Sequence, residues 1–200
     1  MFRRIDLRFL SIAILLIFGA CAHGKAPIVP DQDLPAIADE LEIFANSLTE
    51  AVLANKTALS DAIVKYLESH GPEYFGSTVA VLENGKAVYS PYVYHDEKGA
   101  LVRTDDLMDP SYKIDEQPWL REPIEQGEAI WTEPYFDEGG GNIWMRTRSY
   151  PINLSDGVRA VATTDVRVAE ETLPSSTACK ATSWTIFTSV LLLVTFWVTK

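Results

Sequence analysis

The sequence predicts an α+β domain: a long N-terminal helix and a five-stranded antiparallel sheet, flanked by an N-terminal signal or anchor and a C-terminal transmembrane helix. Apolar residues recur every three or four positions over residues 33–70, whereas apolar and polar residues alternate in short runs over residues 77–166. An α-helix repeats every 3.6 residues and a strand every two, so the first pattern indicates a helix and the second indicates strands. The third observation is that both ends of the chain are apolar.

Composition limits the class of protein. The chain has 200 residues, of which 47% are apolar and 22% charged, which is typical of one globular domain. Residues 27–173 hold 27 acidic and 11 basic side chains, a net charge of −16. Nucleic acid requires a cationic surface, so this composition excludes nucleic-acid binding, and such a body repels anionic lipid.

Residues 1–24 have the pattern of a secretory signal peptide or signal anchor. Three arginines precede an apolar run, Phe9–Ala22, that is short for a membrane span. The stretch Ile17–Cys21 also resembles a bacterial lipobox, in which case Cys21 would be lipidated after cleavage. The alternative is an uncleaved anchor in which Cys21 is only a small apolar residue.

Residues 181–199 are predicted to form a transmembrane helix. This run of nineteen residues carries no charge and has Trp184 and Trp197 near its ends, where interfacial aromatic residues lie. Basic residues flank both apolar ends on their outer sides, which places both ends in the cytoplasm if both segments span. We therefore expect residues 27–180 to lie outside the cytoplasm, anchored to the inner membrane of a bacterial envelope and facing the periplasm or exterior.

The helix is predicted over Asp33–His70, where Gly71-Pro72 ends it. At about 1.5 Å per residue it would be about 55 Å long. Its apolar stripe indicates packing against the sheet, and a parallel homodimer through this helix is the alternative use.

Five strands follow the helix. Asn84-Gly85 between the first two is a strong signal for a β-hairpin turn, and Gly139–Gly141 is predicted to be another strand-to-strand turn. A long loop between Val93 and Ala129, with a short helix near Trp119–Gln126, is expected to be functional. The predicted strands are Ser77–Glu83, Lys86–Val93, Ala129–Phe136, Asn142–Ile152 and Val158–Val166.

The sequence predicts no metal and no cofactor. Its cysteines have no zinc-like spacing, and its histidines are isolated from one another. These residues are Cys21, Cys179, His23, His70 and His95.

The order of several short motifs resembles an extracytoplasmic Cache sensor domain, also called PDC-like. The motifs are the SPYVY strand at 90–94, Trp119, the IWTEPYFDEGGGNIWMRTRSYPI segment at 130–152 and VATTDV at 161–166. The resemblance covers residues 33–173 and implies one sensor domain that binds a small ligand between the sheet and the long loop. In that family the signal passes through a following transmembrane helix.

The amino-acid-binding members of that family imply particular site residues. Tyr112, Trp119 and Asp165 match by spacing, but Gln117 stands where those members have an arginine, and Leu120 replaces a tyrosine. A neutral amide does not replace the planar cationic fork that binds a carboxylate, so an amine or a neutral polar ligand is expected. The expected ligand-binding residues are Tyr112, Gln117, Trp119, Tyr135, Arg146 and Asp165.

Structural alternatives remain for these residues. Trp119 and Tyr135 could be packed aromatic residues, Arg146 could face solvent beside acidic residues, and Asp165 could cap a helix that begins near Arg167.

The predicted function is therefore a membrane-anchored extracytoplasmic sensor module. It would bind a small molecule and relay the signal through a membrane helix or a separate signalling protein, without catalysis. The alternatives are a structural envelope lipoprotein and a hydrolase with paired carboxylates such as Glu133 and Asp137. No nucleophile beside a base is recognisable in the sequence, which disfavours the enzyme.

Overall fold

The structure, a computed structural model, describes residues 26–154 and 157–169. The predicted signal or anchor with Cys21, and the predicted transmembrane segment 181–199, lie outside the described residues. Within the described part of the chain, no helix has the length and apolarity needed to cross a membrane.

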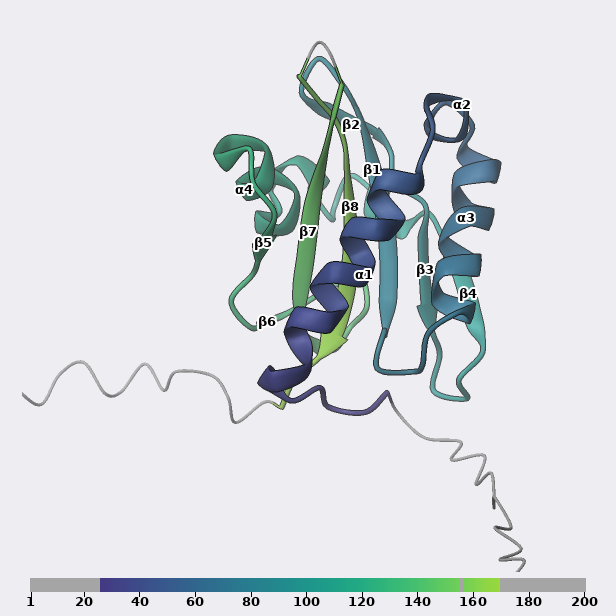
Figure 1. The fold of residues 1–200 in the computed structure, drawn as a ribbon, viewed down its shortest axis with the longest axis vertical. Helices are drawn as coiled ribbons and strands as arrows, with labels where there is room; N and C mark the ends of the chain where they lie inside the picture. Colours follow the sequence, from purple (N-terminus) through teal and green to yellow (C-terminus); the bar gives the residue numbers. More distant parts are fainter. Residues whose placement is uncertain (1–25, 155–156, 170–200) are drawn as a thin grey trace, which may run out of the picture.

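The domain is built on one antiparallel sheet of eight strands (Figure 1). The strand order is β4-β3-β1-β8-β7-β5, while β2 pairs with β1 and β6 pairs with β7. The strands are β1 (Gly76–Glu83), β2 (Lys86–Tyr89), β3 (Tyr92–His95), β4 (Leu101–Thr104), β5 (Ile130–Trp131), β6 (Tyr135–Phe136), β7 (Trp144–Leu154) and β8 (Gly157–Arg167).

The α+β class and the antiparallel sheet are as predicted, but the expected number of five strands is wrong. The predicted strand Lys86–Val93 is divided into β2 and β3 at Ser90-Pro91, and Ala129–Phe136 is divided into β5 and β6 before Tyr135. Proline has no N–H to donate to a neighbouring strand, so Pro91 and Pro134 interrupt the pairing. The remaining strand, β4, lies inside the segment that the sequence analysis treated as a loop.

The predicted single helix is also divided. Its residues form α1 (Leu34–Ser47), α2 (Glu50–Leu53) and α3 (Lys56–Glu68), after a short 3₁₀ turn at Asp31–Asp33. Side chains cap each new start: Thr49 Oγ1 accepts from Val52 N, and Asn55 Oδ1 accepts from Thr57 N and Ala58 N. A side chain that bonds the backbone in this way ends one helix and begins the next. The apolar period continues across the breaks because α1 and α3 pack on the same side of the sheet, where Phe44 stacks on Tyr66.

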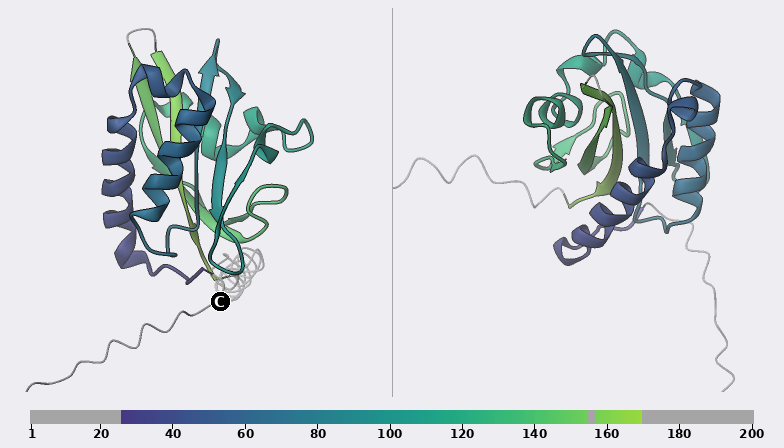
Figure 2. Two further views of the ribbon diagram at one scale, coloured as in Figure 1. Left: turned by 90° about the vertical axis from the view of Figure 1, so that its right-hand side faces the viewer. Right: turned by 45° about the horizontal axis from the view of Figure 1, so that its top comes forward.

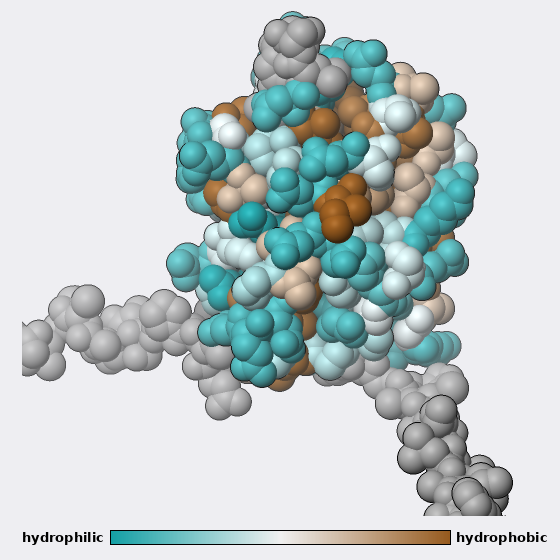
Figure 3. Space-filling model, viewed as in Figure 1, coloured by the Kyte–Doolittle hydropathy of each residue, from teal (hydrophilic) through white to brown (hydrophobic). Residues whose placement is uncertain are grey.

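The sheet lies between two different layers (Figure 2). Helices α1 and α3 cover one face. The long excursion between β4 and β5, residues 105–129, covers the other with two 3₁₀ turns, Asp106–Met108 and Ile114–Glu116, and α4 (Pro118–Gln126). The helix layer encloses an aliphatic core that includes Leu41, Leu59 and Ile63, each fully buried. Its outer surface is mostly hydrophilic, with small separate hydrophobic areas (Figure 3). The second core, under the excursion, contains Leu107, Tyr112, Trp119 and Leu120.

Three central strands bring polar residues together at one end of the sheet. Asp165 of β8 lies opposite Gly76 of β1 on one side and opposite Thr147 of β7 on the other. The ring of Tyr92 from β3 crosses Gly76, where an added Cβ would come within 2.5 Å of the Tyr92 hydroxyl. This close approach explains the glycine at position 76.

Candidate ligand-binding site

Asp165 is a buried carboxyl near the end of the central strand β8. Its residue is 5% exposed, and its Oδ1 accepts a hydrogen bond of 2.8 Å from Thr147 Oγ1. Strand β8 continues through Arg167, and no helix begins at that point. The capping role considered for Asp165 is therefore wrong, and its side chain instead faces the layer of the long excursion.

The excursion contributes a chain of hydrogen bonds to the same region. Trp119 Nε1 donates to Tyr112 Oη at 3.0 Å, and Tyr112 Oη donates to Asp137 Oδ1 at 2.9 Å. The other oxygen of Asp137 accepts from Gly141 N at 2.7 Å. Asp137 therefore joins the excursion to the loop 137–143, which connects β6 to β7.

Two further tyrosines lie in the same region as Asp165 and Asp137. Tyr135 Oη lies 2.8 Å from Thr147 Oγ1, and because that hydroxyl donates to Asp165, Tyr135 donates to Thr147. The Tyr92 hydroxyl is buried and has no hydrogen-bond partner among the described residues. Burial, and then the charge of the nearby Asp165 carboxylate, raise the pKa of Tyr92.

These side chains enclose a small interior cavity of about 10 Å³. That volume accommodates about one water molecule. A larger open pocket of about 710 Å³ lies outside it, and Tyr112 and Asp137 line both spaces. The Tyr112–Asp137 hydrogen bond therefore lies in the partition between the inner cavity and the outer pocket. The inner cavity is lined by Thr78, Tyr92, Leu107, Tyr112, Trp119, Tyr135, Asp137, Thr163 and Asp165.

The inner cavity strongly disfavours negative charge. Burial, and then the charge of Asp137, raise the pKa of Asp165 from its ordinary 3.8 to about 7. Burial also raises the pKa of Asp137, although the Gly141 N–H and the Tyr112 hydroxyl oppose the change. No basic side chain is among the described residues that line this cavity. Because desolvation and like charge both disfavour carboxylates, a cation or a hydrogen-bond donor would be stabilised here.

The structure brings together four of the six residues expected to bind ligand. Tyr112, Trp119, Tyr135 and Asp165 all line the inner cavity. Gln117 lines only the outer pocket, where its Nε2 donates to the Tyr112 carbonyl at 2.7 Å.

Arg146 lies away from both spaces. Its Nε donates to the Thr132 carbonyl, and Nη1 lies 3.6 Å from the exposed carboxylate of Asp31. Cys21, the expected lipidation site, is outside the described residues.

Sequence reasoning did not include Asp137 or Tyr92 among the ligand-binding residues. Asp137 was considered only as one of two hydrolase carboxylates, with Glu133, which is exposed and lines a different surface pocket. The signal that could have found Asp137 is its position two residues after Tyr135 in a turn. No group of three or more potential metal ligands occurs among residues 26–154 and 157–169.

Comparison with known families finds one match. The sequence model of the methyl-accepting chemotaxis protein-like family, first PDC sensor domain, matches residues 59–171, which is more than half of the chain. A comparison with curated proteins finds no match.

Solved structures share the fold. The extracellular domain of soHK1S-Z6, named as a histidine kinase, is 24% identical with a TM-score of 0.56, over 67% of this chain and 53% of that one. The ligand-binding domain of the Campylobacter jejuni chemoreceptor Tlp3, solved with L-valine, is 15% identical with a TM-score of 0.52, over 68% of this chain and 53% of that one. The chain thus spans about half the length of these sensor domains.

Proposed function

Because the chain belongs to the methyl-accepting chemotaxis protein-like family of first PDC sensor domains, we propose that it is the ligand-binding part of a membrane-anchored extracytoplasmic sensor. The ligand would be a small molecule held between the sheet and the long excursion. The domain would bind it without catalysis and pass the signal to a membrane helix or a partner protein.

The observation that carries this proposal is the polar inner cavity. Two carboxyls with raised pKa values and the unpaired Tyr92 hydroxyl are buried around one small space. Buried carboxyls, and a buried hydroxyl without a partner, are costly, and a core that served only stability would not require them. A bound ligand that donates hydrogen bonds would compensate this cost.

We propose that the ligand enters from the outer pocket. The inner cavity is too small for a metabolite, so Tyr112 and Asp137 would have to separate for a ligand to reach Asp165. Entry would replace the Tyr112–Asp137 hydrogen bond by bonds to the ligand. The same movement would displace the loop 137–143, so ligand binding would change the conformation of the domain.

The ligand class that fits best is an amine or a neutral polar compound. The inner cavity offers two carboxyls and no described cation, and the net charge of −16 over residues 27–173 attracts cations over a distance. The amide of Gln117 is neutral and its Nε2 already donates to the Tyr112 carbonyl, so this side chain offers no positive charge to a carboxylate. Arg146 would contribute only if it left its present partners.

The test is a thermal-shift screen of the domain without its apolar ends against amines, amino acids and carboxylates, followed by calorimetry. A ligand at 100 times its dissociation constant should add about 2.7 kcal/mol to the free energy of unfolding. Asp165→Ala should weaken binding about ten- to a hundredfold, which corresponds to about 1.5–3 kcal/mol for a charge-assisted hydrogen bond.

Trp119→Ala should also weaken binding, and Gln117→Arg should shift preference toward carboxylates. Asp61→Ala, at an exposed carboxylate on α3, serves as the control and should bind like the parent. A responsive ligand that binds Asp165→Ala as tightly as the parent would exclude this site.

A structural envelope lipoprotein is the second candidate, and the small volume of the inner cavity favours it. The screen separates the two functions, because a purely structural domain would show no shift with any compound. Anchoring is tested separately: Cys21→Ser should abolish acyl labelling if Cys21 is lipidated, and a fusion reporter after Lys86 should be active only outside the cytoplasm.

A homodimer through the N-terminal helices would bring two sensor domains together. Ile43 on α1 is 63% exposed and would be covered in such a dimer. Sedimentation of the parent and of Ile43→Glu tests this arrangement.

A further inference from the structure

We propose that the end of the domain where the chain enters and leaves rests on a lipid bilayer, with Ile28, Phe136 and Trp144 in contact with the lipid headgroups. This inference rests on the proposed function in one respect: the N-terminus must be held in the membrane, either by the uncleaved apolar run 9–22 or by a lipidated Cys21.

A groove at this end of the domain is lined in part by large apolar and aromatic side chains. Its volume is about 570 Å³, and Phe75, Ile143 and Trp144 are among the residues that line it. At its rim Ile28 is 55% exposed and Phe136 is 46% exposed, two of the four large exposed hydrophobic residues in the described part of the chain. Phe136 and Trp144 pack edge to face with ring centroids 5.8 Å apart. Aromatic residues of this kind are enriched at membrane interfaces.

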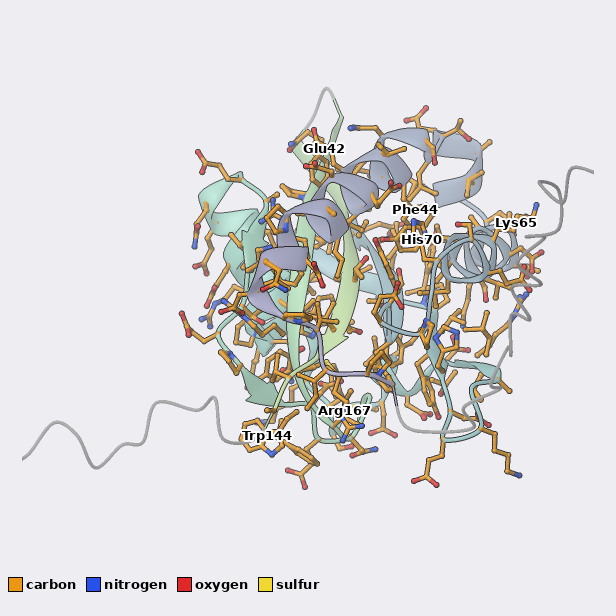
Figure 4. The ribbon with its side chains drawn as sticks, turned by 60° about the horizontal axis from the view of Figure 1, so that its bottom comes forward. Glu42, Phe44, Lys65, His70, Trp144 and Arg167 are labelled. Carbon is orange, nitrogen blue, oxygen red and sulfur yellow. The ribbon has the colours of Figure 1, made fainter. Side chains whose placement is uncertain are left out.

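The two ends of the described chain are fixed to this groove. Val29 N donates to the Arg167 carbonyl at 3.1 Å, and Arg167 Nη1 donates to the Ala26 carbonyl at 3.2 Å. Val168 N donates to the Trp144 carbonyl at 3.1 Å, which joins the end of β8 to the start of β7. Trp144 and Arg167 lie together at this end in Figure 4. The chain therefore enters and leaves the domain beside the groove.

The length of the N-terminal connection sets the distance to the membrane. Only residues 23–25 separate the apolar run, which ends at Ala22, from Ala26 in the groove. Four residue steps reach at most about 14 Å when fully extended. The headgroup layer on one side of a bilayer takes up about 5–8 Å of that length. An anchored N-terminus thus holds the groove within a few ångströms of the headgroups.

Charge selects the kind of lipid. The groove carries both signs, with Arg167 beside Asp96 and Glu97. The body of the domain has a net charge of −16, which repels an anionic surface. A zwitterionic headgroup, with its ammonium and phosphate groups, complements this mixture of charges.

The loop 137–143 connects the groove to the ligand cavity. Gly141 lines the groove, and its N–H bonds the Asp137 carboxylate that lines the inner cavity. Displacement of this loop by a ligand would therefore change the surface that faces the bilayer.

The test is tryptophan quenching in the full chain, reconstituted in phosphatidylcholine vesicles that contain a lipid with a nitroxide on its headgroup. Trp184→Phe and Trp197→Phe remove the tryptophans of the C-terminal apolar run from the background. In that background the nitroxide should quench emission, and Trp144→Phe should abolish the quenched component. Trp131→Phe is the matched control, because Trp131 pairs four residues further along β7, about 13 Å away, and its loss should leave the quenching in place.

A second pair of variants keeps the test independent of Trp144. Phe136→Glu should reduce the quenching, whereas Val88→Glu, at a residue 40% exposed on β2, should not. Partial replacement of phosphatidylcholine by phosphatidylglycerol should also reduce it.

Quenching that is equal with and without Trp144 in vesicle-bound protein would overturn the proposal, as would a mature chain that holds neither its N-terminal apolar run nor a lipidated Cys21. Quenching by the nitroxide that falls as the protein-to-lipid ratio rises would overturn it in favour of a second copy on the groove. Ligand binding by the lipid-free domain is measured separately, so either result can fail without the other.

Discussion

The two faces of the sheet are both buried but are built from different chemistry. Along β8, Ala160, Ala162 and Val166 face the helix layer, where the described core is aliphatic and aromatic. The intervening residues Thr163 and Asp165 face the excursion and line the inner cavity. Side chains alternate between the faces of a strand, so one strand supplies both environments. The comparison indicates that the face covered by α1 and α3, the helix face, contributes most to stability. The face that lines the inner cavity, the cavity face, retains buried polar groups that lower stability.

The largest expected effect tests the helix face. Ile63 of α3 is fully buried in its core, and Ile63→Ala should lower the free energy of unfolding by about 2–5 kcal/mol through lost burial and a residual cavity. Urea denaturation measures the change. Ile43→Ala removes the same atoms from an exposed position on α1 and should change stability by less than about 0.5 kcal/mol. Equal effects of the two substitutions would show that the helices are not packed as described.

The second prediction tests the cavity face, where a buried substitution should stabilise the domain. The pKa of Asp165 is about 7 in the folded state against an ordinary 3.8, so the folded protein retains a proton that the unfolded chain loses first. Stability from this group is therefore present below about pH 4 and is lost as the pH rises to about 7. Asp165→Asn should remove this dependence.

At about pH 8 we expect Asp165→Asn to be more stable than the parent by up to about 4 kcal/mol, and at about pH 4 the two should be similar. Denaturation curves across this range measure the difference. Parallel pH profiles of parent and variant would show that Asp165 does not ionise in the folded domain within this range.

The general architecture was predictable from sequence because alternation and turn chemistry are local. The Asn84-Gly85 hairpin is present, with φ of 51° at Asn84 and 76° at Gly85, as a tight hairpin turn requires. The division of the helix was not recognised, because the apolar period runs through Thr49 and Asn55 without interruption. The strand count failed at Pro91 and Pro134, whose effect on pairing depends on the neighbouring strand.

The candidate site was predictable only in part, for a different reason. The order of motifs indicated Tyr112, Trp119, Tyr135 and Asp165, which line one cavity. By type, Asp137 does not differ from the other acidic residues among the 27 in residues 27–173. Its burial distinguishes it, and burial is a property of the fold. Tyr92 was read only as part of a strand, because an unpaired hydroxyl is a property of its surroundings and not of its sequence.

The third prediction concerns the partition between the two pockets. Tyr112→Phe leaves Trp119 Nε1 and Asp137 Oδ1 without the hydroxyl that joins them. A buried group without its partner costs about 1–3 kcal/mol, so stability should fall by about that amount. Tyr150→Phe is the control, since its hydroxyl makes only a 3.4 Å contact with exposed Glu42 and its loss should have little effect. If both variants unfold at the same urea concentration, the hydrogen-bond chain contributes nothing to the partition.

The smallest expected effect tests whether residues 33–70 form separate helices or one continuous helix. Asn55 Oδ1 accepts from Thr57 N and Ala58 N at the start of α3, so Asn55→Ala should destabilise the domain by about 1 kcal/mol. Asn46 lies exposed within α1, where alanine is the better helix former, so Asn46→Ala should be neutral or slightly stabilising. The same chemical change thus has opposite signs at a cap and inside a helix. If the helix were continuous over residues 33–70, both substitutions would stabilise, and urea denaturation of the two variants distinguishes the arrangements.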